Sequence, residues 1–332
     1  MDRHRRRPAI ALAGLVSRGV LLTVFVGVGA LAALGDAPIR GLMWIAPGAD
    51  PARALGTVPT ECLKIPADAA LAASVEVGRA AFRTPVLLGG QAGRAGVTCE
   101  TCHRSGRANP DFLFPGVSGA PGTADVTSSL FSTHRGNGID DPKPIPDLSG
   151  PRSRLKISQL PADRALEPFI HGLVTEEFDG PEPTPAVLNG LAAYVRALDP
   201  AACPEKPRRP LDVRLLMSDA RRAIRAAQTQ VAAGDAATAA VMVAGARSRL
   251  GLIDERYGAP SLAGERTALR ATDRRLADAQ AALRDHRADA PRRLAAWLAD
   301  AGRLESELRA TETKSLFDPA RLTQAVKRRL PG

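Results

Sequence analysis

The residues of this chain best suited to chemistry form one short run, Cys99-Glu100-Thr101-Cys102-His103. The C-x-x-C spacing puts two thiols on one side of a helical turn, and the histidine that follows can reach a metal from the same turn. C-x-x-C-H is a signature of covalent haem attachment, in which the thiols form thioethers with the porphyrin. Histidine is a usual proximal ligand of haem iron. We therefore predict one covalent haem c, attached through Cys99 and Cys102, with His103 on its iron.

Two other kinds of site use the same cysteine spacing. A zinc site would need two further ligands, but the sequence has no second C-x-x-C and no H-x3-H pair. A redox-active dithiol of the thioredoxin type would need a βαβ context, which the sequence lacks. Haem attachment is therefore the favoured interpretation of the motif.

The sixth ligand of the iron has three candidates. No methionine lies between residues 44 and 216, so a Met ligand is not available in this part of the chain. His171 lies in a predicted helix, and its position shortly before the helix at 186–198 favours it. His134 lies in a Gly-rich loop that can fold over the iron, and an open or water-bound site is the third possibility. His286, further along the chain, is more simply a solvated side chain.

The other two cysteines, Cys62 and Cys203, flank the motif. In an exported protein such a pair is most simply a disulfide, and two unpaired buried thiols are the alternative.

The N-terminus has the features of an export signal. Arginines at positions 3, 5, 6 and 7 precede an apolar stretch from Pro8 to Leu34, and Ala30-Leu31-Ala32 has the form of a cleavage site. The apolar core is long for a signal peptide and close to the minimum for a spanning helix. We expect residues 1–35 to be a signal peptide or a membrane anchor, with a preference for the anchor. The positive-inside rule then places the rest of the chain in the periplasm.

The remainder divides by composition into three segments. Residues 36–61 contain several Pro and Gly and suggest an extended linker. Residues 62–203 are rich in loops, with predicted helices at 69–82 and 186–198. Residues 211–330 carry successive helical stripes of apolar residues and predict an antiparallel helical bundle. The expected fold class is mainly α.

The middle segment resembles the cytochrome c family. In that family the first and last helices cross, with a Gly and an aromatic residue of one against a Leu and an aromatic residue of the other. Gly78, Phe82, Leu191 and Tyr194 match this pattern. The resemblance covers about residues 70–200 and implies a cytochrome c-like haem domain, followed here by the helical bundle.

Within that family the segment from Asp125 to Pro151 looks most like a haem domain of the dihaem cytochrome c peroxidase group. Two features depart from that group. The chain has one C-x-x-C-H motif instead of two, and residues 156–161 (KISQLP) replace the Met-His-Asp-Gly-like segment expected next. These departures weigh against a peroxidase activity.

The net charge of +10 suggests an acidic redox partner or an anionic lipid surface, although solvated helix faces are the plainer explanation. Nucleic acid is disfavoured because export places the chain outside the cytoplasm. The sequence leads us to expect a membrane-tethered monohaem electron carrier rather than an enzyme. A peroxidase-like or gas-sensing protein with an open sixth site is the alternative, and a scaffold with a structural haem is a third possibility.

Overall fold

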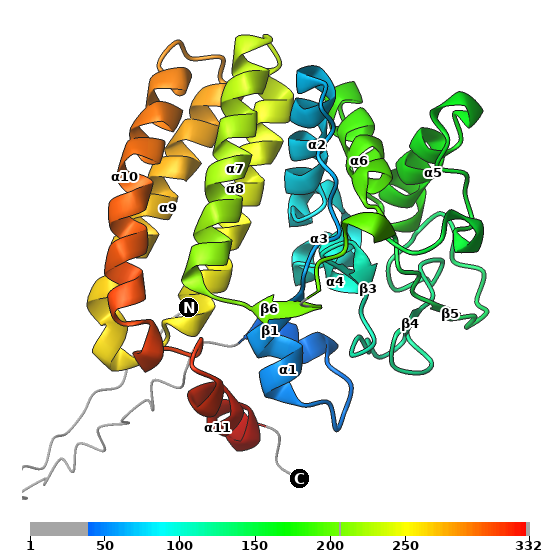
Figure 1. Cartoon of the computed structure of the whole chain (residues 1–332), viewed down its shortest axis with the longest axis horizontal. Helices are drawn as coiled ribbons and strands as arrows, with labels where there is room; N and C mark the ends of the chain where they lie inside the picture. Colours follow the sequence, from blue (N-terminus) through cyan, green and yellow to red (C-terminus); the bar gives the residue numbers. More distant parts are fainter. Residues whose placement is uncertain (1–38, 206, 330–332) are drawn as a thin grey trace, which may run out of the picture. The chain divides into compact units, whose positions relative to one another are not determined.

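The computed structural model describes residues 39–205 and 207–329, and this part of the chain is mainly helical, as predicted (Figure 1). The predicted signal or anchor segment lies outside the described residues. The longer helices are α2 (Ala69–Ala81), α6 (Pro185–Ala197), α7 (Val213–Ala232), α8 (Ala236–Arg256), α9 (Ala263–Arg284), α10 (Ala290–Ala310) and α11 (Pro319–Arg329). The shorter ones are α1 (Pro51–Gly56), α3 (Gly90–Ala95), α4 (Cys99–Cys102) and α5 (Leu166–Gly172).

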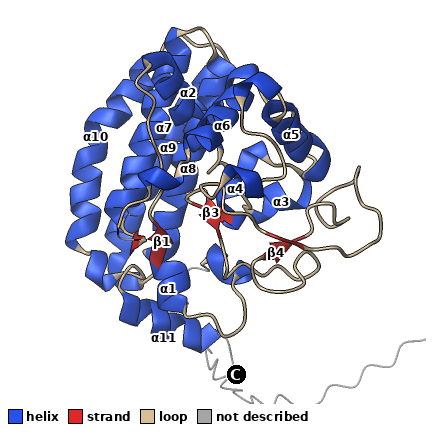
Figure 2. Cartoon of the chain, turned by 45° about the vertical axis from the view of Figure 1, so that its right-hand side comes forward, coloured by secondary structure: helices blue, strands red, loops and turns tan. Residues whose placement is uncertain are grey.

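Six short strands pair in antiparallel twos. β1 (Thr57–Pro59) pairs with β6 (Arg208–Pro210), β2 (His103–Arg104) with β3 (Arg107–Ala108), and β4 (Thr123–Ala124) with β5 (Lys143–Pro144). Figure 2 shows that the β4–β5 part of the chain is mostly loop. These loops have a small aromatic core of their own, because Phe131 packs against Phe114 and Phe178 with ring centroids 5.2 and 5.5 Å apart.

Helices α2 and α6 touch backbone to backbone. A Cβ atom on Gly78 would lie 1.8 Å from the carbonyl oxygen of Gly190, so no larger residue fits at this crossing. One turn further along, the rings of Phe82 and Tyr194 pack with centroids 5.1 Å apart, and Leu191 is buried beside them. The contact that the family resemblance implied for these four positions, with Gly190 in addition, is therefore present.

Helices α7 to α10 form a four-helix bundle. α7 packs on α8, α8 on α9 and α9 on α10, and α10 returns to α7. The turn between α7 and α8 is made by Gly234 in the left-handed region (φ +80°) and by Asp235, whose carboxylate accepts a hydrogen bond from the backbone N–H of Thr238. Each of these helices coincides with a predicted apolar stripe.

Within the described residues, α8 is the one helix long and apolar enough to cross a membrane by length and composition. It lies between α7 and α9, and Met242, Val243, Leu250 and Ile253 on it are fully buried or nearly so. The central helix of a bundle has the same composition as a spanning helix. Its place in the bundle therefore explains the apolar character of α8.

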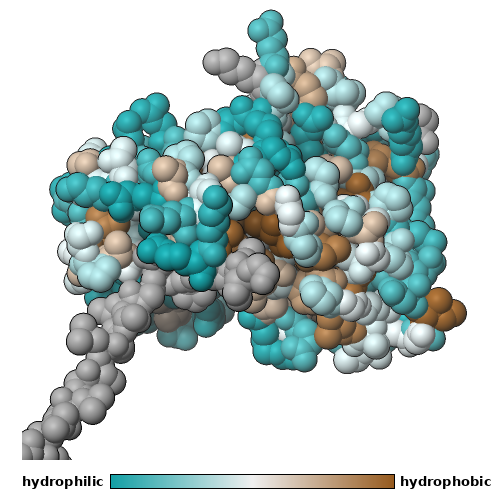
Figure 3. Space-filling view, turned by 90° about the horizontal axis from the view of Figure 1, so that it is seen from below, coloured by the Kyte–Doolittle hydropathy of each residue, from teal (hydrophilic) through white to brown (hydrophobic). Residues whose placement is uncertain are grey.

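Residues 39–59 do not form the extended linker that we expected. They contain a 3₁₀ turn (Arg40–Trp44), α1 and β1, and Ile39 and Leu55 are buried against α11. The prolines misled the interpretation, because Pro51 stands in the first turn of α1, directly after the capping residue Asp50. Figure 3 shows the molecule from below, where α1 and α11 lie, with hydrophilic residues over most of this face.

Residues 62–203, here called the haem-motif segment, share one hydrophobic core with the bundle of α7–α10. α2 packs against α7 and α8 as well as against α6, and Val75 and Tyr194 belong to the same buried cluster as Leu216 and Trp297. The predicted segments 62–203 and 211–330 are therefore in close contact, and the short connection between them pairs with β1 through β6.

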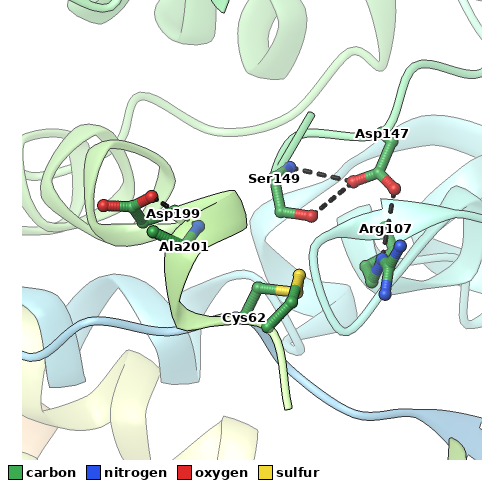
Figure 4. Close-up of a disulfide and its surroundings, with 7 residues drawn as sticks. Cys62, Arg107, Asp147, Ser149, Asp199 and Ala201 are labelled. Carbon is green, nitrogen blue, oxygen red and sulfur yellow. Dashed lines mark hydrogen bonds and ion pairs between the residues drawn. A yellow bond between two sulfur atoms is a disulfide. The ribbon is translucent and has the colours of Figure 1, made fainter. Parts of the chain in front are cut away.

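The predicted disulfide is confirmed. Cys62 and Cys203 are bonded and lie 141 residues apart in the sequence (Figure 4). The bond ties the segment between β1 and α2 to the segment that follows α6, so it encloses the whole of residues 62–203.

Candidate haem-attachment site

The motif cysteines lie at the two ends of the single-turn helix α4. The turn is closed by a capping box, in which the Thr101 hydroxyl accepts a hydrogen bond from the backbone N–H of Thr98 at 2.9 Å. Cys99 and Cys102 stand at i and i+3 of this turn and so share one face of it, and His103 follows directly as the capping residue of α4 and the first residue of β2. Both thiols are free and half-buried.

The imidazole of His103 is oriented by a backbone carbonyl. Its Nδ1 lies 3.0 Å from the carbonyl oxygen of Pro146. Because a carbonyl only accepts hydrogen bonds, this contact assigns the ring proton to Nδ1 and leaves the lone pair on Nε2. Burial lowers the pKa of His103 to about 4, so the ring is neutral at pH 7. A neutral imidazole with one nitrogen anchored and the other available is the form that binds a metal.

The carbonyl of Pro146 is itself held in place by its neighbour. The carboxylate of Asp147 accepts hydrogen bonds from the backbone N–H and hydroxyl of Ser149 at 2.9 and 2.6 Å, and from Arg107 at 3.1 Å (Figure 4). Arg107 lies in β3, which pairs with the strand that contains His103. The same short hairpin therefore fixes both the imidazole and the loop that orients it. The sequence alone did not indicate that residues 146–149 orient His103.

Neither thiol has the features of a reactive cysteine. Burial raises the pKa of both Cys99 and Cys102 to about 12, so both are protonated at neutral pH. Redox-active and nucleophilic cysteines have lowered pKa values instead. This electrostatic environment is unlike that of a thioredoxin-type dithiol.

Glu100, inside the motif, joins α4 to the bundle through a buried ion network. Its carboxylate accepts hydrogen bonds from Arg83 at 3.1 Å and from Arg249 of α8 at 2.9 Å. Arg83 also bonds Glu61 at 3.0 Å, and Glu61 accepts a hydrogen bond from the Tyr194 hydroxyl at 2.6 Å. Burial raises the pKa of Glu100, but the charges of Arg83 and Arg249 outweigh burial, and the pKa lies below 4.5.

Sequence reasoning missed this network because it treated the arginines of the bundle as solvated. The position of Arg249 in the sequence did indicate burial. It lies three residues after Ala246 and directly before Leu250, and both of these belong to the apolar stripe predicted for this helix. Arg249 is accordingly buried with them.

The two candidate distal histidines each lie beside a carboxylate. His171 Nε2 lies 2.9 Å from Glu182, and His134 Nδ1 lies 3.0 Å from Asp179. In the described part of the chain, neither imidazole has a hydrogen bond or ring contact with residues 99–103. His286 is exposed at the end of α9, as expected for a solvated side chain.

The donor set differs from that of an all-protein metal site. Among the described residues, no three His, Cys, Asp or Glu side chains come together in a way that could hold a metal ion. A haem needs no such group, because the porphyrin supplies four nitrogen ligands and the protein adds one imidazole and two thiols. Cys99, Cys102 and His103 fit that requirement.

Comparison with protein-family models, with curated proteins and with solved structures finds no match to this chain.

Proposed function

We propose that this chain is an exported monohaem c-type cytochrome that transfers electrons in the periplasm. Cys99 and Cys102 would each add S–H across one vinyl double bond of the porphyrin, a step that needs no oxidant. His103 would bind the iron through Nε2. When bound, the haem supplies a one-electron iron couple, and the protein supplies attachment, orientation and surroundings.

One observation carries the proposal. Two protonated thiols stand on one helical turn and a neutral imidazole follows that turn directly, and the imidazole is anchored through Nδ1 to the Pro146 carbonyl. The anchored nitrogen fixes the plane of the ring and directs Nε2 away from the loop. A merely structural histidine needs no such partner held in turn by Asp147 and Arg107.

The crossing of α2 and α6 supports a cytochrome c-like fold for residues 62–203. Gly78, Phe82, Leu191 and Tyr194 make the contact that the family resemblance implies. The bundle of α7–α10 would be an addition fixed to that domain, since α2 packs against both.

An enzyme or sensor with an open sixth site is the second candidate. The contacts of His171 and His134 favour it. Each imidazole is bonded to a carboxylate, which would leave the sixth position of the iron without an imidazole ligand. His171 in particular offers its Nε2 to Glu182. An iron with one free position could bind a gas or react with peroxide.

The cellular setting is part of the proposal. The arginines and apolar stretch of residues 1–35 would place the chain in the periplasm, either anchored in the inner membrane or released by cleavage. The net charge of +10 suits an acidic redox protein or an anionic lipid surface as partner, and we propose no role for nucleic acid.

The test is maturation of the full-length chain in a periplasm that contains a c-type haem attachment system. Haem that stays on the polypeptide after acid–acetone extraction, at one per chain, is the expected result. Cys99→Ser and Cys102→Ser should each remove a thioether, and the double variant should lose all retained haem. Thr101→Ser is the matched control, because it changes a residue inside the motif, keeps both thiols and the hydroxyl that caps α4, and should keep the haem.

Optical spectra then separate the two candidate functions. A low-spin spectrum that does not respond to carbon monoxide indicates six-coordinate iron and supports electron transfer. His171→Ala and His134→Ala would then identify the ligand, with His286→Ala as a control. A high-spin spectrum that shifts with carbon monoxide favours the enzyme or sensor. A chain that matures without covalent haem would refute both.

A further inference from the structure

A cavity of about 160 Å³ lies behind the haem motif. Glu100 and Thr101 of α4 line it, whereas Cys99, Cys102 and His103 do not. The opposite wall comes from the bundle, through Leu216 of α7 and Arg249 of α8. The cavity is therefore distinct from the haem-attachment face and lies between the haem-motif segment and the bundle.

The carboxylates that line this cavity are already neutralised. Glu100 is paired with Arg83 and Arg249, Asp111 is paired with Arg53, and Asp219 is paired with Arg222.

Two arginines that line the cavity have no such partner. Within the described part of the chain, no carboxylate lies within 4.0 Å of the guanidinium of Arg104 or Arg209. Arg104 donates only to the backbone carbonyls of Ala54 and Thr57. Burial lowers the pKa of Arg104 to about 10; the positive charges of Arg208 and Arg53 act in the same direction, and the charges of Glu100 and Asp111 oppose them. The lining thus has an excess of positive charge.

Unused hydrogen-bond donors point to the same conclusion. The Nε atoms of Arg209 and Arg249 are both shielded from solvent and have no acceptor in the structure. Arg249 as a whole is 7% exposed. A buried donor without an acceptor and a buried charge without a counter-charge are both unfavourable. A ligand that carries negative charge on several oxygens would supply the counter-charge that Arg104 and Arg209 lack.

We propose that this cavity binds a small oxyanion of the phosphate or sulfate class, held by Arg104 and Arg209. The volume equals that of about five water molecules in the liquid, which is enough for a tetrahedral oxyanion and accompanying water. Arginine suits this role because its planar guanidinium can donate two parallel hydrogen bonds to such an ion. The site is independent of the haem, so it goes beyond the proposed function.

The test is isothermal titration of the full-length chain with inorganic phosphate, and separately with sulfate, at constant ionic strength set by chloride. We expect saturable binding at one site. Arg209→Gln should raise the dissociation constant at least tenfold, because it removes a cation and a donor from the cavity. Arg209 has no hydrogen bond from its side chain in the structure, so the substitution should leave the fold intact.

Arg208→Gln is the matched control. It removes the same charge one position away on β6, and Arg208 does not line the cavity. Phosphate should bind this variant within twofold of the wild type. Phosphate should also raise the Tm of the wild type and of Arg208→Gln, but not that of Arg209→Gln.

Two results would overturn the proposal. Absence of saturable binding by both phosphate and sulfate would mean that the cavity holds only water. Equal weakening by Arg208→Gln and Arg209→Gln would mean that the anion responds to the general positive charge of the surface and not to this site.

Discussion

Replacement of Arg249 by Leu tests whether the bundle and the haem motif are joined by charge as well as by packing. The guanidinium of Arg249 donates to Glu100 at 2.9 Å and to the carbonyl of Arg83 at 3.1 Å, and its side chain is 8% exposed. Loss of one partner from a buried ion pair typically costs about 3–5 kcal/mol. Glu100 keeps its contact with Arg83, so we expect a loss near the lower limit, about 3 kcal/mol.

The assay is unfolding in guanidinium chloride, followed by circular dichroism, at neutral pH. Arg303→Leu is the control, because that side chain is 69% exposed and its pairs with Asp300 and Glu307 lie on the surface. Its loss should change the free energy of unfolding by less than about 1 kcal/mol. The double variant Glu100→Gln/Arg249→Leu should be more stable than the sum of the two single losses predicts, because no unpaired charge remains. A change within about 1 kcal/mol for Arg249→Leu, or strict additivity in the double variant, would refute the reasoning.

Three further predictions follow from single contacts. Gly78→Ala should lower the free energy of unfolding by more than about 2 kcal/mol, because the backbone at Gly190 must move. Gly302→Ala, with open space around it in α10, should raise the free energy of unfolding by about 0.5–1 kcal/mol. Thermal unfolding of both variants checks that the two changes have opposite signs. Cys203→Ser opens a loop of 141 residues and should cost about 5 kcal/mol by loop-closure entropy, and a reducing agent should produce the same loss in the wild type but none in the variant. The pKa of His103 in the folded chain is about 4, below its usual 6.5, so the haem-free chain should lose stability as the pH falls from 6.5 through 4. His103→Gln should flatten this part of the plot of stability against pH, whereas the control His286→Gln should not.

Much of the local structure could be predicted because it depends on patterns within one segment. The apolar stripes between residues 213 and 308 coincide with α7–α10, and the capping residues Asp212 and Asp235 stand where these helices begin. The disulfide followed from the small number of cysteines. The segment 39–59 was misread because Pro is common both in linkers and at the first position of a helix, and only the burial of Leu55 and the pairing of β1 distinguish the two.

The sequence by itself predicted the chemistry proposed for residues 99–103, since the spacing alone sets two thiols one helical turn apart and an imidazole directly after the second. The tertiary structure decided what surrounds them. Pro146 reaches His103 from 43 residues away, and Arg249 reaches Glu100 from 149 residues away. Spacing along the chain constrains only neighbours within a turn or two, whereas contacts of this range depend on how α2, α7 and α8 pack around a common core. For the same reason, the cavity lined by Arg104 and Arg209 could not be seen before the two segments were brought together.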